Sequence, residues 1–257
     1  MPELVRFEAE DGVGIVRLDR PPANAISLDL ANELLQVLKE AEADHDIGAI
    51  VVWGGPKLFA AGADIKEMAV QGPEQVREQV TGLGAACDLL GSIPKLSIAA
   101  ITGYALGGGF ELALACDLRY AADDATVGQP EIRLGVMPGA GGTQRITWLA
   151  GAGVARDLVY TGRQVQAAEA NALRLVERVL PADEVLETAV RDARGFARGP
   201  RVALAAAKEA IQEAVWTPGP AGIARERERF LALFGTDDQR EGMQAFTEKR
   251  DPEFRGS

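Results

Sequence analysis

The sequence predicts an α/β protein in which short buried strands alternate with longer helices. Two apolar runs, residues 4–8 and 13–18, flank Asp11-Gly12, a dipeptide typical of tight hairpin turns. Further along, apolar runs of strand length, residues 47–54 and 96–101, are separated by a segment with helical spacing. Alternation of this kind is typical of parallel strands covered by helices, so we expect a largely parallel sheet after the hairpin.

The remaining elements of this α/β part follow from local patterns. Apolar residues between Ala31 and Leu38 repeat at helical spacing, and Ser27 or Asp29 is available as a helix cap. The pattern then predicts helices at 75–90 and from a glycine-rich turn to Cys116, and strands at 47–54, 96–101 and 118–121.

Strand signals fade after about Ala140, and the rest of the chain is helical in pattern. We therefore expect an α/β core with the functional site in residues 1–197 and a helical region in residues 198–257. The expected helices of this second half lie at 143–149, 154–160, 167–176, 184–196, 202–215 and 223–233.

The overall charge argues against nucleic acid and anionic membrane surfaces as partners. The 257-residue chain has 38 acidic and 27 basic residues, a formal net charge of −11, and only 5% aromatic residues. A phosphate backbone would be repelled by such a chain, whereas a few local cations and helix N-termini can still hold a smaller anionic ligand. We expect no nucleic acid partner.

The sequence also predicts a cytoplasmic protein. The longest apolar stretch, residues 96–116, is interrupted by Thr102, four glycines and Glu111, so no membrane span is expected. The N-terminal residues 1–6 lack the basic and apolar regions of a secretory leader. The two cysteines, Cys87 and Cys116, lie in apolar surroundings and form no CxxC pair, which is typical of reduced core residues.

Histidine chemistry and metal chemistry have little support in this chain. Its single histidine, His45, lies between Asp44 and Asp46 where a surface turn is expected. A Ser-His-Asp or Cys-His mechanism would depend on this one residue, and a zinc site would lack ligands. We therefore expect no metal and no separate cofactor.

A run of three glycines ending at a glutamate is the first motif with chemical content. Residues 103–111 read GYALGGGFE and lead into an apolar helix. Glycines at a helix start let backbone N–H groups approach developing negative charge, although close helix-to-sheet packing selects glycine as well. Glu111 could be a plain stabilising residue of the first turn, but the apolar residues after it predict burial, which raises a carboxyl pKa.

Two further segments fit the same kind of site. Glu131 follows Gln129-Pro130, so it leaves a turn of defined geometry, although a glutamate after proline is also common at a helix start. The small residues 60–63 give a ligand access to the backbone, although Asp64 could simply begin a helix. Together the three segments favour acid/base chemistry next to a carbonyl group.

At these residues the chain closely resembles the crotonase (enoyl-CoA hydratase/isomerase) superfamily, and most closely its hydratases. The resemblance extends to segments 24–27 (NAIS), 138–145 (PGAGGTQR) and 241–250 (EGMQAFTEKR). It implies a spiral of ββα turns and a C-terminal helical region that mediates formation of a homotrimer or of a hexamer built from two trimers.

The resemblance also implies a reaction and a role for each matching residue. The reaction is syn addition of water to a trans-2-enoyl-CoA, giving a 3-hydroxyacyl-CoA, with coenzyme A as part of the substrate. Glu111 and Glu131 match the acid/base pair, and the N–H groups of Ala63 and Gly108 match the oxyanion hole. The implied substrate and coenzyme A contacts are Ala61, Ala63, Asp64, Ile65, Lys66, Leu106, Gly107, Gly108, Pro138 and Gly139, with Phe246 and Lys249 reaching a neighbouring subunit.

Alternatives remain at this level. Members of the superfamily also catalyse isomerisation of 3-enoyl-CoA, among other acyl-CoA reactions, and many such isomerases keep only the carboxylate at the Glu131 position. A non-enzymatic acyl-CoA- or RNA-binding relative would need neither glutamate. Retention of both glutamates favours hydration, and the segment 69–79 is expected to shape the acyl pocket without revealing its chain length.

Overall fold

A six-stranded sheet lies at the centre of the fold, which is a computed structural model describing residues 3–217 and 219–257. The prediction that residues 1–6 lack a secretory leader falls partly on Met1 and Pro2, which lie outside the described residues. The first two strands form the expected antiparallel hairpin, and all later neighbours pair in parallel, as the alternating pattern predicts. In sheet order the strands are β1 (Val5–Glu10), β2 (Val13–Leu18), β3 (Ala49–Trp53), β4 (Leu96–Ile101), β6 (Leu118–Ala122) and β9 (Arg178–Leu180).

A second, three-stranded sheet was not expected from the sequence. It consists of β5 (Tyr104–Leu106), β7 (Thr126–Gly128) and β8 (Gln164–Gln166). The prediction that strands end before residue 140 is therefore wrong for β8 and for β9. Three-residue strands are too short to show a two-residue periodicity, so backbone pairing defines them and side-chain pattern does not.

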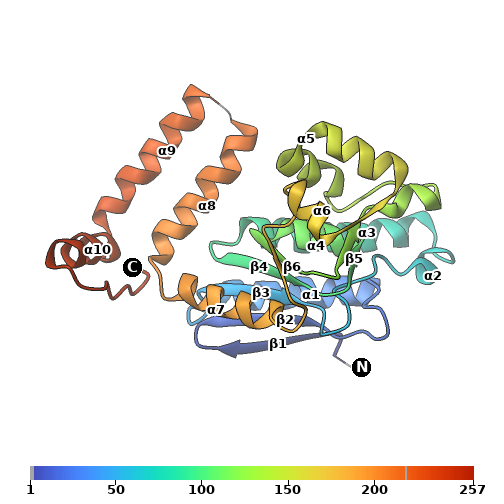
Figure 1. The fold of residues 1–257 in the computed structure, drawn as a ribbon, viewed down its shortest axis with the longest axis horizontal. Coiled ribbons are helices and arrows are strands. Elements are labelled where there is room, and N and C mark those ends of the chain that lie inside the picture. Colours follow the sequence, from blue (N-terminus) through green and yellow to red (C-terminus); the bar gives the residue numbers. More distant parts are fainter. Residues whose placement is uncertain (1–2, 218) are drawn as a thin grey trace.

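Helices cover the sheet and carry the connections between its strands (Figure 1). The long helices α1 (Leu28–Ala43) and α3 (Pro73–Ser92) pack against each other, and α7 (Val185–Ala197) packs on β3 and β4. Ser27, one of the two expected caps, accepts a hydrogen bond from the Leu30 N–H at the start of α1. The other helices of this part are α2 (Ile65–Met68), α4 (Gly108–Ala115), η1 (Pro130–Leu134), α5 (Gly142–Thr161) and α6 (Ala167–Ala172).

Two helix boundaries differ from the sequence prediction because single residues adopt positive φ. The two helices expected between residues 143 and 160 form one element, α5, which bends at Gly151, where φ is 83°. The helix expected over 167–176 ends at Ala172, and Arg174 (φ 63°) turns the chain toward β9. Apolar residues keep their helical spacing beyond such a turn. A helix predicted from periodicity alone is therefore too long.

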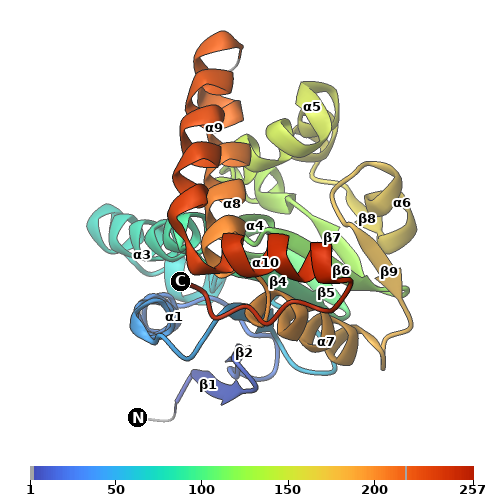
Figure 2. The same cartoon turned by 90° about the vertical axis from the view of Figure 1, so that its left-hand side faces the viewer.

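The helical C-terminal region extends away from the sheet, as two perpendicular views show (Figures 1 and 2). It contains α8 (Arg201–Trp216), α9 (Pro220–Ala232), the short η2 (Leu233–Gly235) and α10 (Asp237–Glu248). The boundary predicted after residue 197 falls between α7 and α8; whether the two parts are separate units stays a prediction, because α8 also contacts β4. None of the described helices is both long enough and apolar enough to cross a bilayer.

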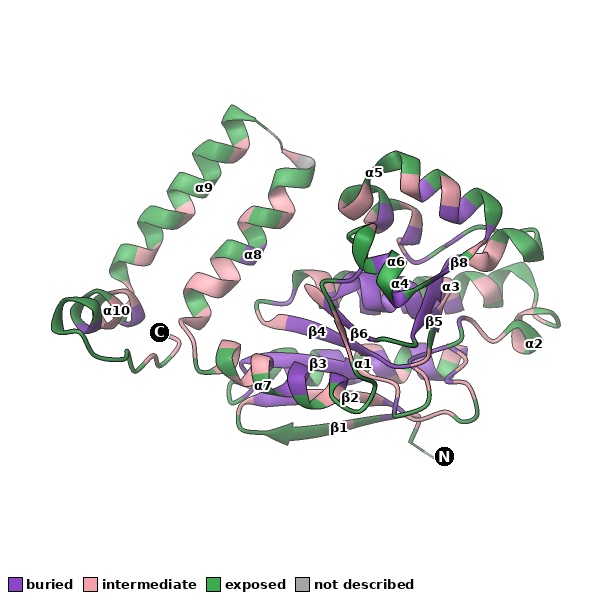
Figure 3. Ribbon diagram, viewed as in Figure 1, coloured by how far each residue is buried: buried purple, intermediate pink, exposed green. Residues whose placement is uncertain are grey.

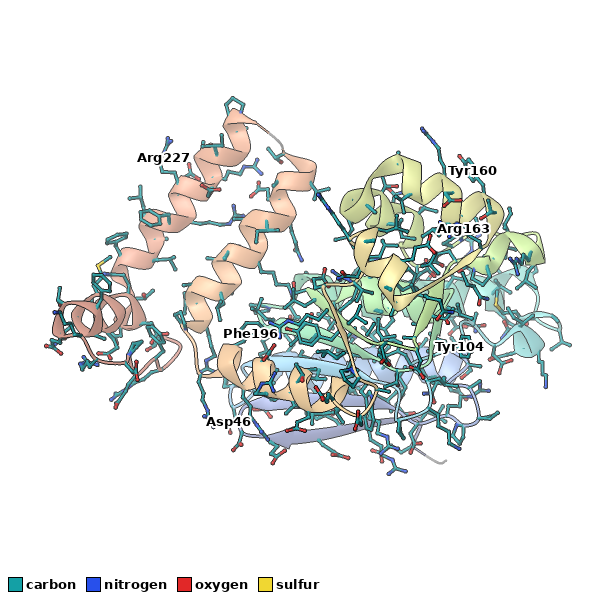
Figure 4. The ribbon with its side chains drawn as sticks, viewed as in Figure 1. Asp46, Tyr104, Tyr160, Arg163, Phe196 and Arg227 are labelled. Carbon is teal, nitrogen blue, oxygen red and sulfur yellow. The ribbon has the colours of Figure 1, made fainter. Side chains whose placement is uncertain are left out.

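Burial is concentrated around the sheet and is sparse in the C-terminal helices (Figure 3). All eight residues of α4 are buried, and the unpaired Cys87 and Cys116 lie in the same core. By contrast, α9 has no buried residue among those described, and Figure 4 shows Arg227 projecting from it away from the sheet. The fold therefore surrounds the glycine-rich turn before α4 with dense packing.

Candidate active site

A cavity of about 240 Å³ opens at the N-terminus of α4, between α3 and the loop after η1. Its walls are mainly apolar and backbone surface, and two carboxylates lie among them. The lining residues are Ile26, Ala61, Gly62, Ala63, Ile65, Met68, Val76, Gln79, Val80, Leu83, Gly107, Gly108, Glu111, Pro130, Glu131, Leu134, Val136, Met137, Gly139 and Ala140.

Two backbone N–H groups on this cavity are free to bind a ligand. Neither the N–H of Ala63 nor that of Gly108 donates a hydrogen bond within the described part of the chain. A Cβ built on Gly108 would lie 3.8 Å from the Ala63 nitrogen, so the two segments meet closely. At the first turn of α4 the helix dipole adds positive potential, which makes this pair of donors suitable for an oxyanion.

The chain brings these donors together through short backbone contacts. Ile26 pairs with Ala63 in an isolated parallel bridge, and Ala60 pairs likewise with Ala105. Gly62 (φ 102°) passes the Leu106 carbonyl so closely that a Cβ there would lie 3.1 Å from its oxygen. Close backbone approach therefore requires glycine at position 62, while access of a ligand to the backbone of residues 60–63 stays a prediction.

Glu111 is a buried carboxylate fixed by backbone donors. Its side chain is on α4 and the residue is 3% exposed. Its Oε1 accepts hydrogen bonds from the N–H groups of Ala140 (2.7 Å) and Gly142 (2.8 Å). Burial raises the pKa of the Glu111 carboxyl, while these N–H groups act in the opposite direction by favouring the charged form.

Glu131 reaches the same cavity from the 3-10 turn η1, directly after the proline that predicts a defined turn. Burial raises its pKa to about 7, and the negative charge of Glu111 contributes in the same direction. Gly107 (φ 51°) leaves space for it, since a Cβ there would lie 3.0 Å from Oε1 of Glu131. Glu131 can therefore exchange a proton near neutral pH.

Gln129 is a functional neighbour that the sequence reasoning did not identify. It is fully buried. With its amide nitrogen turned toward Glu131, it donates to the two carboxylate oxygens at 2.7 and 3.1 Å. The Gln-Pro-Glu order contained the signal, because proline restricts the residue before it and so fixes where the Gln129 side chain starts.

Of the residues proposed for substrate contact, six line the cavity and six do not. Ala61, Ala63, Ile65, Gly107, Gly108 and Gly139 line it. Asp64 instead caps α2 and pairs with Arg20 at 2.7 Å, and Lys66 is exposed on that helix. The other residues absent from the lining are Leu106, Pro138, Phe246 and Lys249.

The last two of these residues belong to the C-terminal region. Phe246 is 84% exposed on α10, and Lys249 ends that helix with φ 57°. Helix α10 lies at the opposite end of the molecule from α3 and α4, whose residues line the cavity (Figure 1). Their predicted contact is with a neighbouring subunit, and that contact stays a prediction.

The inner face of α3 forms a wall that the sequence predicted only in part. Val76 and Gln79 belong to the segment 69–79 that was expected to shape the acyl pocket, and Val80 and Leu83 continue the same face. These four residues follow one another at the three- and four-residue spacing of one helix face. The same pattern therefore predicts that the wall continues beyond residue 79. Within residues 3–217 and 219–257, no cluster of three or more His, Cys, Asp or Glu could hold a metal ion.

Comparisons with known proteins identify the family and agree with this fold. The family model described as enoyl-CoA hydratase/isomerase matches residues 8–257. A Mycobacterium leprae protein named "Probable enoyl-CoA hydratase echA8" is 47% identical over 98% of both chains. A mitochondrial enoyl-CoA hydratase of Pongo abelii is 42% identical over 95% of this chain and 83% of its own length.

Solved structures give the same result at the level of the fold. The crystal structure of an enoyl-CoA hydratase from Bacillus anthracis superposes with a TM-score of 0.95 at 39% identity, covering 99% of this chain and 100% of the other. The similarity covers the α/β core as well as the helical C-terminal region, which is the crotonase-like architecture that the sequence motifs imply. The chain belongs to the enoyl-CoA hydratase/isomerase family.

Proposed function

We propose that this protein is an enoyl-CoA hydratase that adds water to trans-2-enoyl-CoA and releases 3-hydroxyacyl-CoA. The observation that carries the proposal is the presence of two carboxylates, Glu111 and Glu131, on one cavity that also exposes the free N–H groups of Ala63 and Gly108. The relatives named enoyl-CoA hydratase, at 42–47% identity, support the same reaction.

The geometry supports a mechanism through a thioester enolate. The N–H groups of Ala63 and Gly108 donate to the thioester oxygen, where negative charge develops as water adds to C3. Each such donor typically contributes about two to three orders of magnitude in rate. Coenzyme A is carried by the substrate, so the proposal needs no separate cofactor.

The two carboxyl groups divide the proton transfers. The Glu111 carboxylate, held by two N–H donors that favour its charged form, takes a proton from the water whose oxygen bonds to C3. Glu131, with its pKa near 7, gives a proton to C2. Return of the proton from Glu111 to Glu131 resets the pair, and their titrations are coupled because each charge acts on the other.

The proposal includes a homotrimer, or a hexamer of two trimers, in the cytoplasm. Exposed apolar side chains on the C-terminal helices, including Ile211, Phe230 and Phe246, support burial against another copy. The unpaired, buried Cys87 and Cys116 are compatible with a reducing compartment. Light scattering on the purified protein gives the subunit number, and a monomer would contradict this part.

The direct test follows loss of the conjugated enoyl-thioester absorbance of crotonyl-CoA. We expect conversion to 3-hydroxybutyryl-CoA by the wild type and losses of about 10²–10⁴-fold in kcat for Glu111→Gln and for Glu131→Gln. Glu187→Gln, which changes an exposed glutamate on α7, is the matched control and should keep full activity.

Two outcomes would contradict the proposal. Absence of hydration with crotonyl-CoA and with longer 2-enoyl-CoA substrates would remove the hydratase assignment. Conversion of 3-enoyl-CoA to 2-enoyl-CoA that survives Glu111→Gln would instead identify an isomerase that depends on Glu131 alone.

A further inference from the structure

Arg145 is a mostly buried cation close to Glu111 that the acid/base mechanism does not use. It is the fourth residue of α5, and its side chain is 12% exposed. A positive charge near the start of a helix opposes the helix dipole, which favours negative groups there. The described residues of α5 include no acidic residue in the first turn to offset this charge. Contacts outside the helix must therefore account for an arginine at this position.

The guanidinium group of Arg145 folds back over the loop that precedes α5. Its Nη1 donates to the carbonyl oxygen of Ala140 at 2.7 Å, and its Nη2 donates to Asp88 on α3 at 3.1 Å. Gly141 has φ 106°, and a Cβ built there would overlap Nη1 of Arg145. The guanidinium group therefore occupies the space of a side chain at position 141, and only glycine admits it.

The same loop holds the carboxylate of Glu111. The N–H groups of Ala140 and Gly142 donate to its Oε1 at 2.7 and 2.8 Å. These donors belong to the peptide units on either side of the unit that joins Ala140 to Gly141. The carbonyl oxygen of that central unit is the one that Arg145 binds. Arg145 therefore fixes the backbone between the two donors, and its loss would let both change direction.

The two donors differ in what holds them. The peptide unit that carries the Gly142 N–H is held by α5, because the Gly141 carbonyl accepts the N–H groups of Gln144 (3.1 Å) and Arg145 (2.9 Å). Among the described residues, the Ala140 carbonyl accepts a hydrogen bond only from the Arg145 side chain. The segment that carries the Ala140 N–H therefore depends on the guanidinium group, which the helix does not replace.

Charge acts in the same direction as this geometry. The titratable groups close enough to interact with Glu111 are Glu131 on η1, Cys87 on α3 and Arg145 on α5. Burial raises the pKa of the Cys87 thiol, so Arg145 is the one cation in this described group. Asp88 faces Arg145 from a side chain that is 81% exposed, where water screens it. The charge of Arg145 thus favours ionised Glu111, against the burial that raises the pKa of this carboxyl.

We propose that Arg145 is a positioning residue for hydration, whose guanidinium group holds the Ala140 carbonyl and so keeps Glu111 ionised and directed at the attacking water. This inference rests on the proposed hydratase function and adds a residue to it. Arg145 does not line the active-site cavity. It lines a second cavity of about 440 Å³, together with Asp88, so it touches no reacting atom and acts through Glu111.

The test measures kcat for crotonyl-CoA against pH. Arg145→Met removes both the charge and the donor, so we expect kcat at neutral pH to fall about ten- to a hundredfold. Glu111 must be ionised to accept a proton, and Arg145 favours that form. The acid limb of the profile should therefore move to higher pH in this variant. Arg156→Met, at an exposed position of the same helix, is the matched control and should reproduce the wild-type profile.

Two further variants separate the charge from the hydrogen bond. Arg145→Lys keeps the positive charge, so its acid limb should stay near that of the wild type, and kcat should fall less than in Arg145→Met. Arg145→Gln has a neutral amide that can still donate to Ala140, so its acid limb should move to higher pH. An acid limb at the wild-type pH in Arg145→Gln would overturn the inference, even if Arg145→Met does not fold.

A double variant tests whether Arg145 acts through Glu111. If it does, Arg145→Met added to Glu111→Gln should lower kcat by about twofold or less, because the carboxylate that it positions is already gone. A general structural role would lower kcat by the same factor in both backgrounds. Equal factors would therefore contradict the positioning role.

Failure of the inference can be told apart from failure of the proposed function. A hydratase whose pH profile is unchanged in Arg145→Met loses only the proposed role of Arg145. If no 2-enoyl thioester is hydrated, carbon NMR of protein isotopically labelled at the glutamate side-chain carboxyl still follows ionisation, and Glu111→Gln identifies the signal. The Glu111 signal should titrate at higher pH in Arg145→Met than in the wild type, and identical titrations would overturn the inference.

Discussion

The cavity at α4 and the helical region from α8 to α10 are stabilised in opposite ways. Around the cavity, positions are set by close packing: α4 is wholly buried, and Glu111 accepts hydrogen bonds from fixed backbone groups. In α9 no described residue is buried, and charged side chains pair along exposed helix surfaces. The chain therefore fixes the reacting groups by its own core and leaves apolar helix surface available to another subunit.

One link between the two regions is a buried lysine in α8, which acts beside hydrogen bonds from Arg201 to the His45 carbonyl and from Gln212 to the Gly91 carbonyl. Lys208 is 5% exposed, and its Nζ donates to the carbonyls of Leu90 (3.1 Å) and Lys95 (3.0 Å) and to Asp117 (2.9 Å). Asp117 in turn accepts from the backbone and the hydroxyl of Ser97. Because the Lys208 ammonium is buried and all three of its N–H groups are used, the link is sensitive to loss of one partner, although Asp117 is 20% exposed.

The largest stability effect is expected when this link is removed. Lys208→Met leaves Asp117 and two carbonyls without their cation, so we expect a loss of about 3–5 kcal/mol in the free energy of unfolding. Limited proteolysis should then cut near the connection between α7 and α8, where the wild type resists. Lys39→Met, at an exposed position of α1, is the control and should unfold like the wild type. Equal stability of the two variants would show that α8 is held to the core without a contribution from this ion pair.

A smaller effect is expected from one added methyl group in the packed region. A Cβ on Gly109 would lie 2.4 Å from the Ala60 oxygen and 2.7 Å from the Ala60 Cβ, so Gly109→Ala forces the backbone apart. We expect about 1–3 kcal/mol of destabilisation in urea unfolding, together with reduced activity, because residues 60–63 include Ala63, whose N–H is the proposed oxyanion donor. Gly235→Ala in η2 meets nothing within 4 Å and should leave both properties unchanged. Tolerance of Gly109→Ala would disprove the close contact.

The same contrast explains what the sequence could predict. Elements with apolar periodicity or a continuous apolar run, such as α1, α3 and strands β1, β2, β3, β4 and β6 of the main sheet, were predicted because burial repeats along them. The strands β5, β7, β8 and β9 were not predicted, since three residues show no period. In the cavity, the motifs led to Glu111, Glu131, Ala63 and Gly108, whose roles stay predictions. Gln129 was missed because its significance depends on a partner across a turn, the Glu131 carboxylate.

The pH dependence of stability gives a third, more moderate effect, located in the cavity. Glu131 has its pKa raised from 4.5 to about 7, so between these values the folded state binds more protons than the unfolded state. Stability must then fall as pH rises through this window, because ionisation of Glu131 is disfavoured only in the folded protein. We expect Glu131→Gln to remove roughly 1–2 kcal/mol of that fall, after allowance for partial exposure of the carboxyl.

Urea unfolding at pH 4.5 and at pH 7.5 measures this effect. The stability of Glu131→Gln relative to the wild type should increase with pH, whereas Glu187→Gln should show no such trend. A difference between Glu131→Gln and the wild type that stays constant across this range would mean that Glu131 titrates normally.

The smallest effect is expected from a charge cluster at the end of α10. Arg250 pairs with Glu241 at 2.6 Å and with Glu248 at 2.7 Å, and it is the main cause that lowers the pKa of Glu241 to about 2. The stability that Glu241 gains from this pairing is fully present at neutral pH, because it is lost only as pH falls through the lowered pKa of Glu241. Exposed pairs are nevertheless weak and are screened by salt, so Arg250→Ala should shift Tm less than any of the destabilising variants above, and the shift should vanish near ~1 M salt. Arg250→Lys keeps the charge but lacks the planar guanidinium group. Its Tm should therefore lie between the Tm of the wild type and that of Arg250→Ala. A large shift that persists in high salt would show that the C-terminal region is stabilised by its own ion pairs, and the contrast with the packed cavity would then no longer hold.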